Sequence, residues 1–164
     1  MRIMFTIKAG YSDQIEFKSS ADKVRDFFCD MKNFADLMPG VASIHEDAKG
    51  VAHWRINADL PVVGTMTQKF AVELAENSDE RVAWFPVSVE TGNFLRYSAD
   101  FLEKAKNVTI VHFSQMVELR RKSARERHML AGIAGESLIS SEMSKKISEM
   151  IKIFIQRAKE RLEK

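Results

Sequence analysis

The chain has 164 residues, 45% of them hydrophobic and 29% charged, which is enough length and apolar content for a core that needs no disulfides. Its single cysteine, Cys29, cannot form an internal disulfide, and no run of about 18 apolar residues is present that could span a membrane. These features exclude a disulfide-stapled domain and a protein with membrane-spanning helices. With no signal peptide and no linker visible, we expect a single domain, residues 1–164, located in the cytoplasm.

Charge is spread unevenly along the chain. Residues 1–103 carry 11 Lys and Arg against 16 Asp and Glu, whereas residues 104–164 carry 14 against 7. The basic part contains the run Arg120, Arg121 and Lys122, which could dock on an anionic membrane surface or an acidic protein; the alternative is a solvated turn and helix start. The run lacks interleaved aromatic residues and a helix-turn-helix signature, so we do not expect nucleic-acid binding.

The N-terminal segment predicts a strand followed by a helix. Apolar residues alternate with polar ones over residues 3–17, which is typical of a strand. Ser19 can cap a helix over residues 19–38, with a break near Asp30 and an end at Pro39-Gly40. The helix has apolar residues at i, i+3, i+4 and i+7, which are Val24, Phe27, Phe28 and Met31.

Residues 41–121 predict an antiparallel meander of short strands joined by turns. The expected strands are residues 41–46, 51–57, 62–74, 81–87, 94–102 and 108–119. From about residue 126 to residue 164 the spacing of apolar residues changes to that of a helix. These residues form one apolar stripe, and Lys146 is expected to lie off it. The whole pattern predicts an α+β fold in which a curved antiparallel sheet of six to seven strands carries its helices on one face.

No residue pattern in the chain indicates catalysis or metal binding. Glycine-rich phosphate loops and nucleophile motifs are missing from the sequence. The histidines His45, His53, His112 and His128 are scattered, and none pairs with another or with Cys29 at the spacing of metal ligands. We therefore expect no catalytic residue, no metal and no cofactor.

The order of elements resembles that of the START/Bet v-type helix-grip superfamily, which includes polyketide cyclases, aromatase-like proteins and carriers of lipids or quinones. The resemblance rests on the strand that runs into "SSA" and a helix, the Pro-Gly that leads into the second strand, the meander, and the long amphipathic C-terminal helix. The stretch "FCDMKNFADLMPGV" is similar to the helix-loop region of the G-type subunits of carbon monoxide dehydrogenase, with Met38 in place of a leucine. The resemblance implies a cavity between the sheet and the long helix, closed at one end by two short helices.

In each predicted strand and helix the apolar residues recur on one side, and that side indicates which residues would face such a cavity. The predicted ligand-binding residues are Phe28, Met31, Trp54, Met66, Gln68, Phe70, Trp84, Tyr97, Gln115, Ile147, Met150, Ile151 and Phe154. Ile56 and Met143 lie in the same phase, and Met38 is expected at the entrance. A close-packed core is the alternative interpretation. Three members, Gln68, Tyr97 and Gln115, need hydrogen-bond partners, because a buried polar group without one costs about 1–3 kcal/mol.

These observations favour a protein that binds or transports a hydrophobic small molecule or lipid without catalysing a reaction. Two alternatives follow from the resemblance. One is an enzyme similar to polyketide cyclases or dehydratases, which would need an acid or base in the cavity. The other is an accessory protein that docks on a membrane or a partner protein, as the likeness to the carbon monoxide dehydrogenase stretch implies.

Overall fold

Seven antiparallel strands form one sheet in the part of the chain that the structure, a computed structural model, describes: residues 5–61, 64–121 and 136–164. The strands are β1 (Phe5–Phe17), β2 (Val41–Glu46), β3 (Ala52–Leu60), β4 (Gly64–Asn77), β5 (Arg81–Pro86), β6 (Asn93–Ala105) and β7 (Val108–Arg121). Their order across the sheet is β1-β7-β6-β5-β4-β3-β2, so β1 and β2 are the edges. The predicted meander and the predicted α+β class are confirmed.

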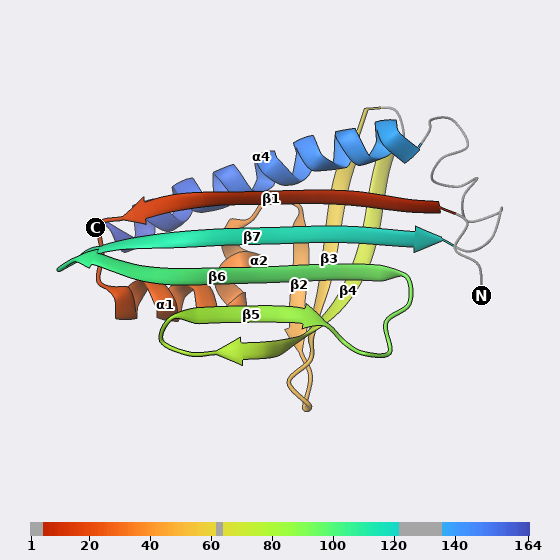
Figure 1. Cartoon of the computed structure of the whole chain (residues 1–164). Coiled ribbons are helices and arrows are strands. Elements are labelled where there is room, and N and C mark those ends of the chain that lie inside the picture. Colours follow the sequence, from red (N-terminus) through yellow and green to blue (C-terminus); the bar gives the residue numbers. More distant parts are fainter. Residues whose placement is uncertain (1–4, 62–63, 122–135) are drawn as a thin grey trace.

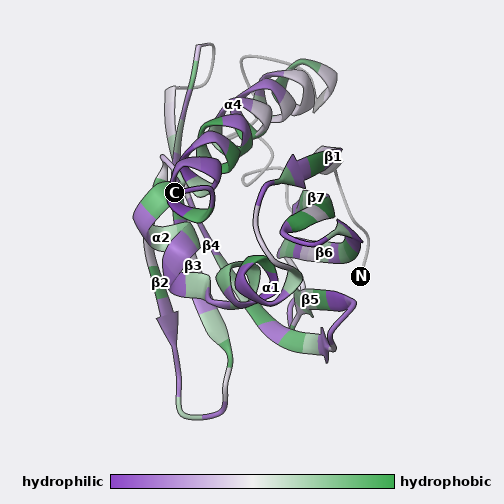
Figure 2. Cartoon of the chain, turned by 90° about the vertical axis from the view of Figure 1, so that its left-hand side faces the viewer, coloured by the Kyte–Doolittle hydropathy of each residue, from purple (hydrophilic) through white to green (hydrophobic). Residues whose placement is uncertain are grey.

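The sheet curls strongly, because β2, β3 and β4 cross the direction of β1, β6 and β7 (Figure 1). Side chains on β7 alternate between buried and more exposed positions along the whole strand, so one face of the sheet is packed and the other is solvated. In the end-on view of Figure 2, the helices lie between the two arms of the sheet. The curl therefore creates a concave side that the helices cover.

Two short helices follow β1, and their caps explain where each begins. Helix α1 (Ala21–Cys29) is capped by Ser20, whose Oγ accepts a hydrogen bond from the Lys23 backbone N–H at 3.3 Å. The predicted cap, Ser19, was wrong by one position, since Ser19 is buried just past the end of β1. Asp30 ends α1 and caps α2 (Met31–Leu37), as its Oδ1 accepts from Lys32 N–H at 3.0 Å. The predicted break at Asp30 is confirmed.

The Pro39-Gly40 turn presses closely against the rest of the fold. Gly40 has a φ of +88°, which side chains disfavour. A Cβ atom at this position would also lie 2.8 Å from the carbonyl oxygen of Asn57 and 2.8 Å from the Cε of Met150. The backbone N–H of Asn57 donates to the Gly40 carbonyl at 2.7 Å. This turn thus fixes the end of α2 to β3 and brings it against the long helix.

Helix α4 (Glu136–Leu162) lies lengthwise over the concave side, alongside β1 (Figure 1). Its apolar stripe is buried as predicted, apart from Ile147, which is half-buried. The buried members are Ile139, Met143, Met150, Ile151, Phe154, Ala158 and Leu162. The predicted start near residue 126 lies outside the described residues.

Four strands run further than predicted, and two of them, β3 and β7, reach Leu60 and Arg121. β4 continues to Asn77 and β6 to Ala105, and the turn after β6 is completed by Asn107 with a φ of 60°. The extra residues of β4 and β6 are mostly exposed and polar, so they lack the apolar alternation on which the prediction rested. Backbone hydrogen bonds between strands do not depend on that alternation, and the pairing continues past it.

An aromatic cluster fills the part of the concave side that lies over α1. Phe28 is fully buried at its centre. Six rings have centroids 5.3–6.4 Å from the Phe28 ring, and they belong to Phe17, Phe27, Phe34, Phe101, Phe113 and Phe154. Most pairs are edge-to-face or tilted, the arrangements that aromatic quadrupoles favour. This half of the interior is therefore occupied by contacting aromatic rings.

Candidate functional site

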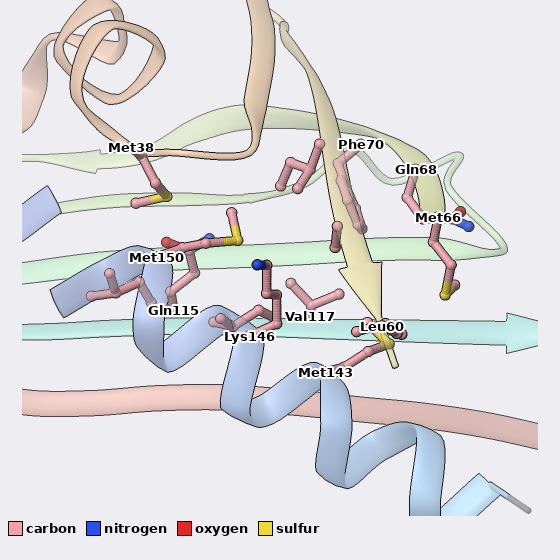
Figure 3. A pocket seen from close by; sticks show the side chains of 14 residues that line it. Met38, Leu60, Met66, Gln68, Phe70, Gln115, Val117, Met143, Lys146 and Met150 are labelled. Carbon is pink, nitrogen blue, oxygen red and sulfur yellow. The ribbon is translucent and has the colours of Figure 1, made fainter. Parts of the chain in front are cut away.

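A pocket opens on the other half of the concave side, between α4 and strands β3, β4 and β7 (Figure 3). Predicted site residues contribute half of its lining: Met66, Gln68, Phe70, Gln115, Ile147, Met150 and Ile151. The other half was not among the predicted site residues: Met38, Ile56, Ala58, Leu60, Val117, Met143 and Lys146. The lining is thus apolar except for two amides and one ammonium group.

The space inside the pocket is narrow. The cavity volume is about 40 Å³. Four of the residues that line it are flexible methionines, namely Met38, Met66, Met143 and Met150. Because ligand pockets usually measure about 300–1,000 Å³, a ligand would have to displace these side chains.

The remaining predicted site residues lie in the packed core and do not line the pocket. They are Phe28, Met31, Trp54, Trp84, Tyr97 and Phe154. The aromatic cluster explains the placement of Phe28 and Phe154, because their rings pack on each other and on the ring of Phe34. The pattern of apolar residues shows which side chains point inward. It does not show which of them pack against other side chains and which border a pocket.

Tyr97 uses its hydroxyl group to connect the sheet to α1. The Tyr97 hydroxyl donates to the carbonyl oxygen of Phe28 at 2.8 Å, which is one of the carbonyls left unpaired at the end of a helix. Burial raises the pKa of the Tyr97 phenol well above its usual value, and the nearby Cys29 adds to the shift. Tyr97 is therefore a neutral hydrogen-bond donor with a structural role.

Replacing Tyr97 with phenylalanine is expected to lower the free energy of unfolding by about 1–3 kcal/mol, because the buried Phe28 carbonyl loses its donor. Urea denaturation measures the change. Tyr11→Phe is the matched control: the Tyr11 hydroxyl donates to the exposed Asp13 carboxylate at 3.1 Å, and its loss should cost less than about 0.5 kcal/mol. Equal effects of the two substitutions would contradict the structural role of Tyr97.

The two amides of the pocket differ in their hydrogen bonding. The Oε1 of Gln68 accepts from Asn93 Nδ2 at 3.0 Å and from the Arg121 guanidinium at 3.2 Å. Gln115 is only 2% exposed, and its Oε1 has no hydrogen-bond partner among the described residues. Ser19 Oγ and the indole nitrogens of Trp54 and Trp84 are also buried without a partner in the described part of the chain, but these residues do not line the pocket. Gln115 therefore presents an unsatisfied acceptor at the pocket.

Lys146 is the charged residue of the lining, and the prediction that it lies off the apolar stripe was wrong. It follows Met143 by three residues and precedes Met150 by four, so the three share one face of α4. In Figure 3 the Lys146 side chain rises from α4 toward the middle of the pocket. The helical spacing could have identified it, but its charge suggested a solvated position.

Ala58, Leu60 and Val117 were also missed, although a simple signal was present. Ala58 and Leu60 continue the two-residue period of Trp54 and Ile56 along β3, and Val117 continues that of Gln115 along β7. All three face the concave side and line the pocket. The alternation of inward and outward side chains continues in both strands beyond the residues that the prediction included.

The basic run at the end of β7 makes contacts within the chain. The Arg120 guanidinium pairs with Glu118 and lies 4.3 Å from the centroid of the Phe94 ring. The Arg121 guanidinium donates to the carbonyl of Gly92 at 3.3 Å as well as to Gln68. Lys122 lies outside the described residues. Docking of this run on an acidic partner or anionic membrane stays a prediction.

Other kinds of site find no support among residues 5–61, 64–121 and 136–164. Within those ranges no three His, Cys, Asp or Glu side chains come together in a way that could hold a metal ion. No helix there is long and apolar enough to cross a membrane. The described pocket lining contains neither a carboxylate nor an imidazole. The chemistry that the lining offers is hydrogen bonding by amides, charge pairing by one ammonium group, and apolar contact.

Comparison with known proteins finds similarity in structure but not in sequence. No family model matches the chain, and no curated protein matches it. The Zhui aromatase/cyclase from Streptomyces sp. R1128 has a TM-score of 0.67 at 12% identity, with 95% of this chain and 94% of that chain covered.

Two further solved structures extend the comparison. A START superfamily protein from Mycobacterium smegmatis has a TM-score of 0.62 at 10% identity, over 94% of this chain and 97% of its own. A conserved protein from Geobacillus kaustophilus has a TM-score of 0.63 at 10% identity, over 96% and 95%. At these identities the likeness concerns the fold alone. The curled antiparallel sheet that grips a long C-terminal helix is the helix-grip fold, and this chain adopts it.

Proposed function

We propose that this protein binds a hydrophobic small molecule or lipid in the pocket between α4 and the sheet, and that it does so without catalysing a reaction. The observation that carries the proposal is the buried Gln115 Oε1, an acceptor without a partner in the described structure, set in an otherwise apolar lining. An unsatisfied buried acceptor costs about 1–3 kcal/mol, and a ligand hydroxyl or N–H would recover that free energy. A few polar groups in an apolar lining are typical of pockets that orient a ligand.

Binding is favoured over catalysis by the kinds of polar groups at the pocket. General acid–base catalysis needs a group with a suitable pKa within reach of the ligand, and amides do not serve. Of the described lining residues, Lys146 alone carries a titratable group. The alternative of a cyclase-like enzyme draws its support from the fold shared with aromatase/cyclases, and a fold does not determine the function of its sites.

Ligand binding can be tested with the purified full chain. Native mass spectrometry should detect co-purified cargo, and the neutral dye Nile red should become fluorescent when it enters the pocket. Release of cargo by organic extraction followed by recovery of dye binding would identify the two as competitors. A folded protein that carries no cargo and binds no apolar dye would overturn the proposal.

The Gln115 acceptor gives a sharper test. Gln115→Met keeps the volume of the side chain but removes the polar atoms, so we expect affinity for naphthol to fall by about tenfold while affinity for naphthalene is unchanged. The same change should raise the free energy of unfolding by about 1 kcal/mol, because it removes an unsatisfied buried acceptor. Isothermal titration calorimetry and urea denaturation measure the two effects.

Gln14→Met on the exposed face of β1 is the matched control, and it should change neither quantity. If Gln115→Met weakens naphthol and naphthalene equally, the amide does not accept a hydrogen bond from the ligand. The pocket would then recognise its ligand by apolar contact alone.

A further inference from the structure

Lys146 places a positive charge on the wall of an otherwise apolar pocket. Its neighbours on the same face of α4 are Met143, Ile147 and Met150, which belong to the lining. Within the described residues its ammonium group forms no ion pair or hydrogen bond. Lysine often covers apolar surface with its stem while the charged head stays in water, but here the head points into the pocket (Figure 3).

Lys146 stands where this pocket meets a second, more polar hollow. Lys146 and Met150 line both spaces, and the second space also borders Asn57, Asp59 and Glu149. Neither of the two carboxylates is paired with Lys146 in the structure. The ammonium group therefore lies at a boundary, with apolar side chains on one side and polar, solvated groups on the other.

This arrangement matches a ligand that has an apolar body and a charged end. We propose that the ligand is a single-chain amphiphile with a carboxylate head, whose chain lies in the apolar pocket and whose head pairs with Lys146 at the boundary. The inference rests on the proposed function, since it names the class of ligand for the same pocket. The Gln115 acceptor then lies along the path of the chain, where it can take a hydrogen bond from a hydroxyl substituent.

The charge balance favours a monoanion over a phosphate ester. One ammonium group compensates one negative charge, and a second charge at the same place would lie near Asp59 and Glu149 without a cation of its own. Phosphate recognition also commonly uses the forked donors of arginine or several backbone N–H groups. The described lining contains no arginine.

The test compares ligands that differ only in the head group. Decanoic acid, decan-1-ol and decyl phosphate are titrated into the wild-type chain and into Lys146→Met, which keeps the length of the side chain and removes the charge. We expect the wild type to bind decanoate at least about tenfold more tightly than Lys146→Met does, as a charge-assisted hydrogen bond is lost. Affinity for decan-1-ol should stay within about twofold.

Two control variants separate a local effect from the net charge of the protein. Lys145→Met removes the same charge from the neighbouring, exposed position on α4, and it should leave decanoate binding unchanged. Glu149→Gln removes a carboxylate that borders the same boundary, and it should strengthen decanoate binding.

Each result supports or overturns a distinct statement. Equal affinities for decanoate and decan-1-ol, both insensitive to Lys146→Met, would overturn the carboxylate assignment and leave the proposed function standing. Tighter binding of decyl phosphate than of decanoate would overturn the preference for a monoanion. If none of these compounds and no Nile red binds to the folded chain, the proposed function itself fails.

Discussion

Replacing Phe28 with alanine is expected to lower the free energy of unfolding by about 3–5 kcal/mol, a large part of the roughly 5–15 kcal/mol that is typical of a domain. Phe28 is fully buried, and the rings of six other aromatic residues surround it. Removing its ring leaves a cavity that β1, β6, β7 and the helices α1, α2 and α4 border at once, and packed elements cannot all move to close it. Urea denaturation followed by tryptophan fluorescence measures the change.

Leu102→Ala is a suitable control for Phe28→Ala, because Leu102 is a large apolar residue of β6 that is 64% exposed. That substitution should cost less than about 0.5 kcal/mol. A loss below about 1 kcal/mol for Phe28→Ala would mean that the aromatic cluster is loosely packed. Phe28→Leu adds a second test: it should keep the fold and leave Nile red binding unchanged, because Phe28 does not line the pocket.

The fold could be predicted because its signals are local and repeat along the chain. The strand period of two, the helix period of 3.6, the break at Asp30 and the stop at Pro39-Gly40 each fix one element, and all of them agree with the structure. Errors were confined to the ends of elements. The cap moved from Ser19 to Ser20, and β4 and β6 extend beyond the last apolar residue that marked them.

The site was harder to predict, because its position depends on how tightly inward side chains pack. Phe28 and Ile151 are both apolar, inward and fully buried, yet Phe28 is enclosed by other rings and Ile151 borders the pocket. The curl of the sheet and the sizes of facing side chains decide between these outcomes. The hydrophobic pattern of a single strand or helix predicts neither of them. Lys146 shows the opposite problem, since its charge concealed a position that the helical spacing alone would have identified.

Blocking the pocket should have the largest effect on ligand binding. We expect Ala58→Phe to reduce affinity for Nile red and for decanoate by about a hundredfold or more, while the protein remains folded. Ala58 is a half-buried pocket residue on β3, opposite Met66 of β4. A phenyl ring at this position would occupy the space that a ligand chain needs, and the flexible methionines of the lining would pack against it. The cost of overpacking, about 1–3 kcal/mol, should be partly offset by the apolar surface that the ring buries.

The control for this variant is Thr67→Phe, which adds the same ring to the exposed outer face of β4 and should leave binding intact. Calorimetric titration gives the affinities, and circular dichroism with urea denaturation shows that both variants are folded. Ala58→Phe separates the pocket from every other apolar surface of the chain, because it changes the accessible volume without removing a polar group or a charge. If the folded Ala58→Phe variant binds Nile red and decanoate as tightly as the wild type, the ligand does not enter the space between α4 and the sheet. The carrier function would then need another surface, and the unsatisfied Gln115 acceptor would be a cost to stability without a role in recognition.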